Sequence, residues 1–418
     1  MQAHTPIHDF TSMLSPGFFC CPTRILFGPG CRHDLAPLIR KLGFTRVALV
    51  TDAYFETQSP FVAELVAACT AQGIACSVFG GGEADPTLAL CDAATAALRQ
   101  QVEGPIDCVI ALGGGSNIDL AKVLCLTLPG RQAAESYVGL AMFPVKPLPL
   151  IALPTTAGTA SEITPGAILI RDAQSPKVAV MGNDLRALVA VVDPELTLSC
   201  PPRVTADAGV DALTHAIESY ITQDAALFDR GGDADPGYSG RNPLTRIFAR
   251  ESISLCFRYL ERAYRNGADL EARAGMCMAS LYAGLSYASA GLNAVHALAY
   301  GLGAVRHETH GRSNGVLLPY VMDSLTDTRA AELGEIASLA AAEGLTAGQS
   351  AARIVRDLIV RLGMPENLRD FGIGESDIPR VVEGGLAVAR LTKAYPAQDA
   401  PARYRRLVER AFAGDIGT

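Results

Sequence analysis

The stretch Asp207-Ala-Gly-Val-Asp-Ala-Leu-Thr-His-Ala-Ile-Glu-Ser-Tyr220 lies just beyond the point where strand-like sequence gives way to helical sequence. It places Asp211 and His215 four residues apart, and on a helix this spacing puts both side chains on one face, one turn apart. A carboxylate and an imidazole so arranged can hold one divalent metal from one side. The alternative is an ordinary helical pair, because this spacing also arises by chance.

A second stretch, Gly291 to Gly311, carries histidines that could complete such a site. His296 and His310 are the obvious pair within it. One aspartate and three histidines form a mixed nitrogen and oxygen set suited to zinc or ferrous iron, with room for a substrate oxygen. We therefore predict a metal site, and the alternative is that these histidines are unrelated to the first pair.

The residues before these stretches alternate between strand and helix. Residues 46–52 form a short apolar run typical of a strand buried on both faces. Similar runs occur at residues 18–27, 74–79, 108–112, 148–154 and 188–193, with helical stretches between most of them, while residues 167–170 and 177–181 are predicted to form a strand pair. This alternation predicts a parallel α/β sheet. After about Pro194 the pattern is helical to the end, so we predict a tail over residues 1–17, an α/β domain over 18–196 and a helical domain over 197–418.

Two loops that follow strands carry residues suited to a phosphate. The run Gly113-Gly-Gly-Ser-Asn-Ile-Asp119 joins a strand to a helix, so its backbone amides and the helix N-terminus can face an anion. It is not a Gly-x-Gly-x-x-Gly motif, and glycines also simply make turns. The run Pro154-Thr-Thr-Ala-Gly-Thr-Ala-Ser-Glu162 carries hydroxyl groups that could bond a pyrophosphate or a ribose. The same hydroxyls could instead cap a helix.

Composition excludes several other classes of protein. The chain has 418 residues, 49% of them hydrophobic, which suits two domains with buried cores. The net charge is −8 without a basic run, so nucleic acid and anionic membrane are poor partners. No apolar stretch reaches transmembrane length and no secretory signal is evident. The 11 cysteines form no Cys-x-x-Cys pair and indicate a reducing cytoplasm.

With these segments assembled, the chain from about Phe19 to Met322 resembles the iron-containing alcohol dehydrogenase family, which is related in fold to glycerol dehydrogenase and dehydroquinate synthase. The resemblance rests on motifs in a fixed order: Gly113-Gly-Gly-Ser-x-x-Asp-x-Ala-Lys122, Pro154–Glu162, Asp193-Pro-Glu195, Gly209–Glu218, and His296-Ala-Leu-Ala with His310-Gly311. It implies a dehydroquinate synthase-like fold, in which an α/β N-terminal dinucleotide-binding domain is followed by an all-α C-terminal domain.

The resemblance also implies the cofactors, the partners and the residues that hold them. The cofactor is NAD, the metal is Fe²⁺ with Zn²⁺ as the alternative, and the substrate is a small-molecule alcohol or aldehyde. The assembly is a homodimer or larger. The implied metal ligands are Asp211, His215, His296 and His310. The implied cofactor residues are Gly114, Gly115 and Ser116 at the pyrophosphate, Thr155, Thr156 and Thr159 beside the cofactor, Lys177 near its ribose, and Asp52 at the adenosine ribose.

The chain departs from the family at one catalytic position. Many members carry a second histidine four residues after the third ligand, where this chain has Tyr300, and the usual proline before the last ligand is Thr309. A phenol is a poorer base than imidazole near neutrality. His307 lies three residues before the last ligand and could supply the proton relay instead. The alternative is that His307 only lines the wall of the site.

Three other functions compete with a metal-dependent alcohol dehydrogenase. A dehydroquinate synthase-like lyase would need a basic cluster for a phosphorylated substrate, and none stands out. A maleylacetate reductase-like enzyme could lack the metal, which the intact aspartate and histidines argue against. A catalytically silent scaffold would keep the fold without the reaction. For a metal-dependent alcohol dehydrogenase, Asp52 at the end of a buried strand predicts a preference for NAD over NADP. A carboxylate at this position repels the additional phosphate of NADP.

Overall fold

The computed structural model describes residues 16–101, 103–140, 142–171, 177–345 and 348–417. These residues divide into two compact units. We call residues 21–201 with 267–277 the α/β unit, and the chain up to Cys20 with 202–266 and 278–418 the helical unit. The sequence-based domain boundary at residues 196–197 stays a prediction, because a compact unit defined by contacts need not coincide with a folding domain.

A sheet of parallel strands forms the centre of the α/β unit. Its order among the described residues is β1-β8-β5-β4-β2-β3. The strands are β1 (Arg24–Phe27), β2 (Arg46–Asp52), β3 (Ala75–Gly82), β4 (Cys108–Gly113), β5 (Leu150–Pro154) and β8 (Val189–Val192), and an antiparallel pair is formed by β6 (Gly166–Ile170) and β7 (Lys177–Met181). The apolar runs that predicted a parallel α/β sheet are confirmed, because strands β4, β5 and β8 are buried along their whole length.

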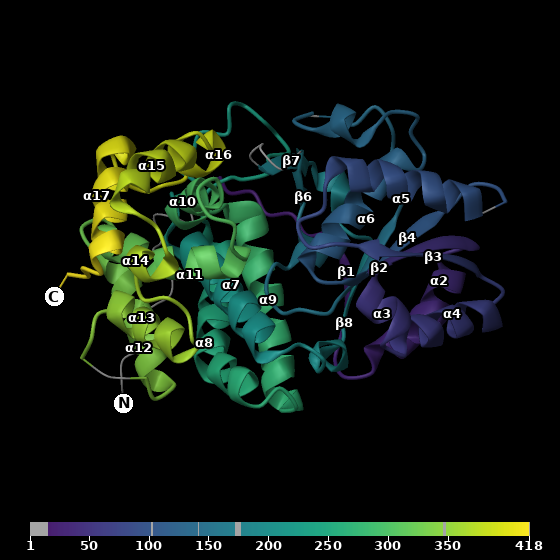
Figure 1. The fold of residues 1–418 in the computed structure, drawn as a ribbon, viewed down its shortest axis with the longest axis horizontal. Helices are drawn as coiled ribbons and strands as arrows, with labels where there is room; N and C mark the ends of the chain where they lie inside the picture. Colours follow the sequence, from purple (N-terminus) through teal and green to yellow (C-terminus); the bar gives the residue numbers. More distant parts are fainter. Residues whose placement is uncertain (1–15, 102, 141, 172–176, 346–347, 418) are drawn as a thin grey trace. The chain divides into compact units, whose positions relative to one another are not determined.

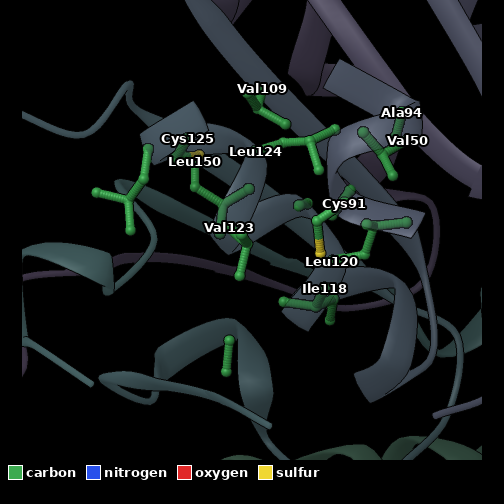
Figure 2. Close-up of a cluster of buried hydrophobic side chains, with 14 of the residues drawn as sticks. Val50, Cys91, Ala94, Val109, Ile118, Leu120, Val123, Leu124, Cys125 and Leu150 are labelled. Carbon is green, nitrogen blue, oxygen red and sulfur yellow. The ribbon is translucent and has the colours of Figure 1, made fainter. Parts of the chain in front are cut away.

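Helices cover both faces of this sheet (Figure 1). They are α2 (Leu35–Lys41), α3 (Ala53–Thr57), α4 (Phe61–Ala71), α5 (Leu88–Gln101) and α6 (Gly115–Thr127), with short 3-10 helices at Cys31–Asp34, Ala134–Tyr137, Ser161–Ile163, Asn183–Leu185 and Pro194–Thr197. Alternate strand residues face opposite sides. Val50 and Val109 therefore pack with α5 and α6 in one core (Figure 2), while Leu49 and Ile110 pack with α2 and α4 in another.

The first strand is shorter than its apolar sequence predicts. The run at residues 18–27 predicts one strand, but β1 begins only at Arg24. Phe18 instead lies in the helical unit, where its carbonyl accepts hydrogen bonds from Ser239 Oγ at 3.2 Å and Asn242 Nδ2 at 3.0 Å. Its neighbour Cys20 donates its N–H to Ser289 Oγ at 3.1 Å. Side-chain partners thus take the backbone groups that a strand would need.

The strand order decides where the loops of the α/β unit meet. Strands β2, β4 and β5 are neighbours, and Gly113 at the end of β4 is in register with Pro154 at the end of β5. The chain moves outward in one direction after β2 and in the other after β4, and in parallel sheets such a reversal is the usual position of a ligand site, at the carboxyl ends of the strands. Asp52, the glycine run and the threonine run follow these three strands.

Helices make up the described part of the other unit, apart from its loops. They are α7 (Pro202–Ile221), α8 (Pro243–Arg265), α10 (Ala294–Gly303), α11 (His310–Ser324), α12 (Ala330–Ala342), α13 (Ala351–Arg361), α14 (Leu368–Phe371), α15 (Ile378–Leu386), α16 (Ala389–Thr392), α17 (Ala400–Ala413), a 3-10 helix at Glu375–Asp377, and α9 (Leu270–Ala290) from residue 278 onward. None of the helices described is long and apolar enough to cross a membrane. All 11 cysteines are free thiols.

Glycines let two pairs of helices in this unit approach closely. A Cβ atom at Gly311 of α11 would lie 1.9 Å from the carbonyl oxygen of Asp207 in α7. A Cβ atom at Gly301 of α10 would lie 2.1 Å from the carbonyl oxygen of Val381 in α15. Contacts this short do not occur between real atoms, so both positions need glycine for steric reasons. The spacing between α7 and α11 and the spacing between α10 and α15 are therefore fixed.

Candidate metal centre and cofactor loops

Three helices of the helical unit bring the predicted metal ligands together. Asp211 and His215 come from α7, His296 from α10 and His310 from α11. The carboxylate of Asp211 lies 3.8 Å from His215 Nδ1, 3.9 Å from His296 Nε2 and 4.0 Å from His310 Nε2. Asp211, His215 and His296 are buried and each offers a ligand atom within 4.8 Å of the others, whereas the side chain of His310 is 40% exposed.

Glu218, which the sequence did not single out, fixes the orientation of His296. Its carboxylate forms a very short hydrogen bond with His296 Nδ1. The same carboxylate accepts the N–H groups of Asn293 at 3.2 Å and Val295 at 2.7 Å, at the start of α10. The bond at Nδ1 leaves the lone pair on Nε2 facing Asp211, as a metal ligand requires. Glu218 lies one helical turn after His215, and that spacing is the signal that could have identified it.

The protonation of these groups favours a cation at their centre. Burial alone would raise the pKa of Asp211, but the three surrounding histidines hold that pKa below its ordinary value, so the carboxylate is ionised. Burial lowers the pKa of His296 to about 4; Asp211 opposes this shift and the positive charge of Arg390 adds to it. Burial raises the pKa of Glu218 to about 8, although backbone N–H groups counteract it. His296 is therefore neutral at pH 7, with an unprotonated nitrogen available.

Asn314 is a second residue that sequence reasoning missed. It is fully buried, and its Nδ2 lies 2.8 Å from Asp211 Oδ1, 3.1 Å from His296 Nε2 and 3.2 Å from His310 Nε2. Its Oδ1 has no hydrogen-bond partner. Four residues separate it from His310 on α11, so it lies on the same face of the helix. The amide thus touches three of the four ligand side chains at once.

Thr309 and Gly311 position the last ligand. Thr309 precedes α11, and its Oγ1 donates a hydrogen bond to Asp207 Oδ2 at 2.7 Å. Asp207 lies one turn before Asp211 on α7, and burial raises its pKa. With the close approach at Gly311, this bond ties the start of α11 to α7. The threonine that replaces the usual proline therefore makes a contact that proline could not make.

The donor set fits a divalent metal ion. A tetrahedral site with ligand bonds of about 2.1 Å places neighbouring ligand atoms about 3.4 Å apart, and the separations from Asp211 are 3.8 to 4.0 Å. Three imidazoles with one ionised carboxylate suit zinc or ferrous iron. A buried carboxylate among imidazoles, together with an orphaned amide oxygen on Asn314, is the environment that a cation would stabilise.

The two residues considered for proton relay lie in different surroundings. Tyr300 follows His296 by one turn of α10 and is partly buried. Its hydroxyl accepts a hydrogen bond from Arg390 Nη2 at 2.9 Å, so its own proton is directed elsewhere. His307 lies between α10 and α11 with an exposed side chain. The choice between them stays a prediction.

In the α/β unit, the glycine run lies directly against the threonine run. A Cβ atom at Gly115 would fall 2.6 Å from Thr159 Cγ2, and one at Gly114 would fall 3.4 Å from Thr156 Oγ1. Thr155 is buried, and its N–H bonds the carbonyl of Gly113 at 3.0 Å. The predicted pyrophosphate residues and the predicted threonines therefore form one surface at the N-terminus of α6.

Ser116 and Lys177 join the same region through Asp85. Ser116 Oγ accepts the N–H of Asp85 at 3.2 Å, which leaves its hydroxyl proton free to donate to a ligand. Lys177 Nζ forms an ion pair with Asp85 Oδ1 at 2.5 Å, and both side chains are partly exposed. Asp85 has a positive φ of 51°, an uncommon conformation for a residue with a side chain. Lys177 is thus held near the glycine run by a carboxylate.

Asp52 combines a structural contact with the position expected of a ribose ligand. Its Oδ1 caps α3 by accepting the N–H groups of Tyr54 and Phe55, and its Oδ2 accepts Asn117 Nδ2 at 2.8 Å. Asn117 belongs to α6 and packs against Gly113, whose φ of 152° and missing side chain make room for it. Sequence reasoning missed Asn117, which connects the end of β2 to the glycine run.

The chain is similar to known proteins over most of its length. Residues 22–194 match the model of the family "iron-containing alcohol dehydrogenase", and residues 237–411 match that of its C-terminal domain. Long-chain-alcohol dehydrogenase 1 of Geobacillus thermodenitrificans is 34% identical, over 94% of this chain and 98% of that protein. The 4-hydroxybutyrate dehydrogenase of Cupriavidus necator is also 34% identical, over 82% of this chain and 86% of that protein.

Solved structures give the same result. The crystal structure of a 1,3-propanediol oxidoreductase matches with a TM-score of 0.85 and 28% identity, over 95% of this chain and all of that one. This match confirms the predicted combination of a parallel sheet region with a helical C-terminal region. The chain therefore belongs to the iron-containing alcohol dehydrogenase family.

Proposed function

We propose that this protein catalyses the reversible oxidation of an alcohol to an aldehyde or ketone with NAD, at a divalent metal ion held by Asp211, His215, His296 and His310. The observation that carries the proposal is the meeting of these four side chains from three helices in a chain of this family. A bound metal ion supplies Lewis-acid polarisation of the substrate oxygen, and the nicotinamide supplies the hydride acceptor.

The residues of the helical unit prepare this chemistry. Glu218 holds His296 in the tautomer that a ligand needs, and the bond between Asp207 and Thr309 sets the start of α11, which carries His310. Rigid ligands lose less freedom when they bind, which favours tight and specific binding. His307 is our candidate for moving the substrate proton to water, because its imidazole is exposed and lies three residues before His310. Tyr300 is the alternative.

The residues of the α/β unit bind the cofactor in this proposal. Backbone amides at Gly114 and Gly115 and the hydroxyl of Ser116 hold the pyrophosphate at the N-terminus of α6. Thr155, Thr156 and Thr159 line its side, Lys177 lies near the ribose, and Asp52 accepts hydrogen bonds from the adenosine ribose. We infer NAD as the cofactor from Asp52, and an NAD-dependent methanol dehydrogenase of Bacillus methanolicus is among the relatives.

Members of this family are named for different alcohols, so membership alone does not define the substrate. Relatives are named for long-chain alcohols, 4-hydroxybutyrate and 1,3-propanediol. Fe²⁺ is the metal we propose, with Zn²⁺ as the alternative. The cytoplasm and a homodimeric or larger assembly stay predictions.

An assay of cofactor reduction tests the proposal. The metal-free protein is loaded with Fe²⁺ or Zn²⁺ without oxygen and given a panel of primary and secondary alcohols with NAD or NADP. We expect NAD reduction, followed at the nicotinamide absorbance, that needs the metal and is reversed by the aldehyde. Absence of any alcohol-dependent reduction under these conditions contradicts the proposal and leaves a scaffold or a lyase of the same fold.

A further inference from the structure

Arg390 of α16 is a partly buried arginine with few partners. Its Nη2 donates to the Tyr300 hydroxyl at 2.9 Å, and its guanidinium group lies over the Tyr300 ring, 5.5 Å from the ring centre. No carboxylate in the described part of the chain pairs with it, and its Nε is enclosed without a hydrogen-bond partner. Among the described residues, Nη2 is the guanidinium nitrogen of Arg390 that forms a hydrogen bond, and Nη1 has no partner there.

Two buried arginines of the helical unit, Arg241 and Arg329, are neutralised by acids. Arg241 pairs with Asp224 at 2.8 Å and with Glu332 at 2.7 Å. Arg329 pairs with Asp224 at 2.8 Å. Taking a guanidinium ion out of water is costly unless an anion compensates it. The contrast indicates that the anion for Arg390 comes from outside the described chain.

The position of Arg390 places that anion beside the metal centre. Tyr300, the residue that Arg390 contacts, lies four residues after His296 on α10, so the two side chains share one face of the helix. The neighbouring cation Lys393 is turned to other partners, since its Nζ lies 4.9 Å from the centre of the Phe228 ring and donates to the carbonyl of Asp229. Arg390 is therefore the cation of α16 that faces the side of α10 carrying a metal ligand.

We propose that Arg390 binds a carboxylate group of the substrate, so that the enzyme acts on hydroxy acids and the corresponding aldehyde acids. This inference rests on the proposed alcohol oxidation. The carbon that bears the hydroxyl gives a hydride to NAD and the hydroxyl gives a proton to solvent, while the carboxylate at the other end is unchanged. A guanidinium group binds a carboxylate by charge-assisted hydrogen bonds, and Nη1 is the donor available for this.

Matched substrates and variants test the inference. The substrates are 4-hydroxybutyrate and 1,4-butanediol, which have the same carbon chain and differ in one carboxylate. In Arg390→Met we expect the ratio of kcat/KM for the acid to that for the diol to fall about tenfold to a hundredfold, mainly through KM of the acid. Arg390→Lys, which keeps the charge, is expected to recover part of this ratio. Arg380→Met is the control, because Arg380 is exposed and its one hydrogen bond to a described residue is to the carbonyl of Ala304.

Three kinetic results would overturn the inference. An unchanged ratio in Arg390→Met removes the carboxylate site. An equal loss for both substrates assigns Arg390 a structural role through Tyr300. A selective increase in KM for NAD assigns it to the cofactor instead.

Binding of butyrate to the metal-loaded, NAD-bound protein, measured by calorimetry, separates this inference from the proposed reaction. Butyrate carries the carboxylate but has no hydroxyl to oxidise. We expect Arg390→Met to weaken its binding at least about tenfold. If neither alcohol is oxidised but butyrate binding depends on Arg390, the proposed oxidation fails and the carboxylate site stands. If the diol is oxidised and butyrate binding does not depend on Arg390, only the carboxylate site fails.

Discussion

Buried charges occur in both units, but their surroundings differ. In the α/β unit, the ammonium group of Lys122 donates to Ser161 Oγ, to both oxygens offered by Thr164 and to the Gly166 carbonyl, at 2.6 to 3.0 Å. Asp119 beside it accepts Ser161 Oγ at 2.5 Å and the N–H of Ile168 at 2.9 Å. We call these residues the Lys122 cluster. Each of its charges has partners within the unit, so it connects α6 to β6 and leaves no place for a ligand.

The metal centre of the helical unit has the opposite balance. The carboxylate of Asp211 and the imidazole nitrogens are hydrogen-bond acceptors that face one another. Among the described residues, Asn314 is the one that donates to several of these acceptors. The comparison shows that burial of charged groups does not by itself identify a functional site. A functional site is indicated instead by an excess of unpaired hydrogen-bond acceptors or donors that face one point. Such an excess is stabilised only when a ligand binds there.

The largest effect that we expect comes from a ligand of the metal centre. His296→Ala removes one of four ligands, so bound metal should fall to a small fraction and alcohol oxidation should fall at least about a thousandfold. Metal analysis after gel filtration and the NAD assay measure the two quantities. Full metal content with full activity in this variant would show that the centre does not bind the catalytic ion.

The corresponding change in the Lys122 cluster should act on stability instead. Lys122→Met leaves Asp119 and the acceptors of the ammonium group buried without a partner, so we expect a loss of about 3 to 5 kcal/mol in the free energy of unfolding. Metal content should stay at the wild-type level. Urea unfolding and metal analysis check both points, and loss of metal from a folded Lys122→Met protein would remove the distinction between the two clusters.

The pH dependence of stability is the control for this variant. Burial lowers the pKa of Lys122 to about 8 from its ordinary value of 10.5, although the negative charge of Asp119 opposes this shift. The charged form is therefore disfavoured in the folded protein, fully so below pH 8. As pH rises from about 8 to 10.5, Lys122 loses its proton in the folded protein before it does in the unfolded chain, so the free-energy cost of burying its charge disappears. The wild type should gain stability relative to Lys122→Met over this interval, and a constant difference would contradict it.

An intermediate effect is expected at Glu218. Glu218→Gln keeps the size of the side chain but replaces the carboxyl group next to His296, which can exchange a proton, with an amide. Loss of such a carboxylate from a metal-bound histidine typically weakens metal affinity about tenfold to a hundredfold. Competition with a coloured chelator measures this affinity without any turnover. An unchanged affinity would mean that Glu218 only caps the start of α10.

A smaller effect is expected at Asp52, which has both a structural and a binding role. We expect at least about tenfold higher catalytic efficiency with NAD than with NADP, because the carboxylate repels the additional phosphate. Asp52→Ser keeps a residue able to cap α3 and should narrow this gap mainly by improving the use of NADP. Equal use of both cofactors by the wild type would disprove the role of Asp52 in specificity.

The smallest effect concerns the proton relay. His307→Ala should lower turnover by less than about tenfold, because water can partly replace an exposed imidazole, and should flatten the rate profile near neutral pH. Tyr300→Phe is the matched variant for the alternative relay. If the neutral inflection persists in His307→Ala and disappears in Tyr300→Phe, the relay is Tyr300.

Much of this arrangement follows from local sequence patterns. The apolar runs predicted the parallel sheet because its strands are buried on both faces, and helical spacing placed Asp211 beside His215. The contacts of Arg390 with Tyr300 could not be predicted in this way, because 90 residues separate them and no periodic pattern connects them. The closure of the Lys122 cluster by Thr164 and Gly166 also depends on tertiary packing that the sequence does not display.

The contact at Gly311 limits how this enzyme can diversify. A methyl group there would require α11 to move about 1.5 to 2 Å from α7 to reach normal van der Waals separation, and this would displace His310 together with its neighbours. Selection for new substrates can instead act on Tyr300 and Arg390, which lie beside the centre without setting the spacing of α7 and α11. A randomised library is therefore expected to return glycine at position 311 whatever alcohol is used for selection.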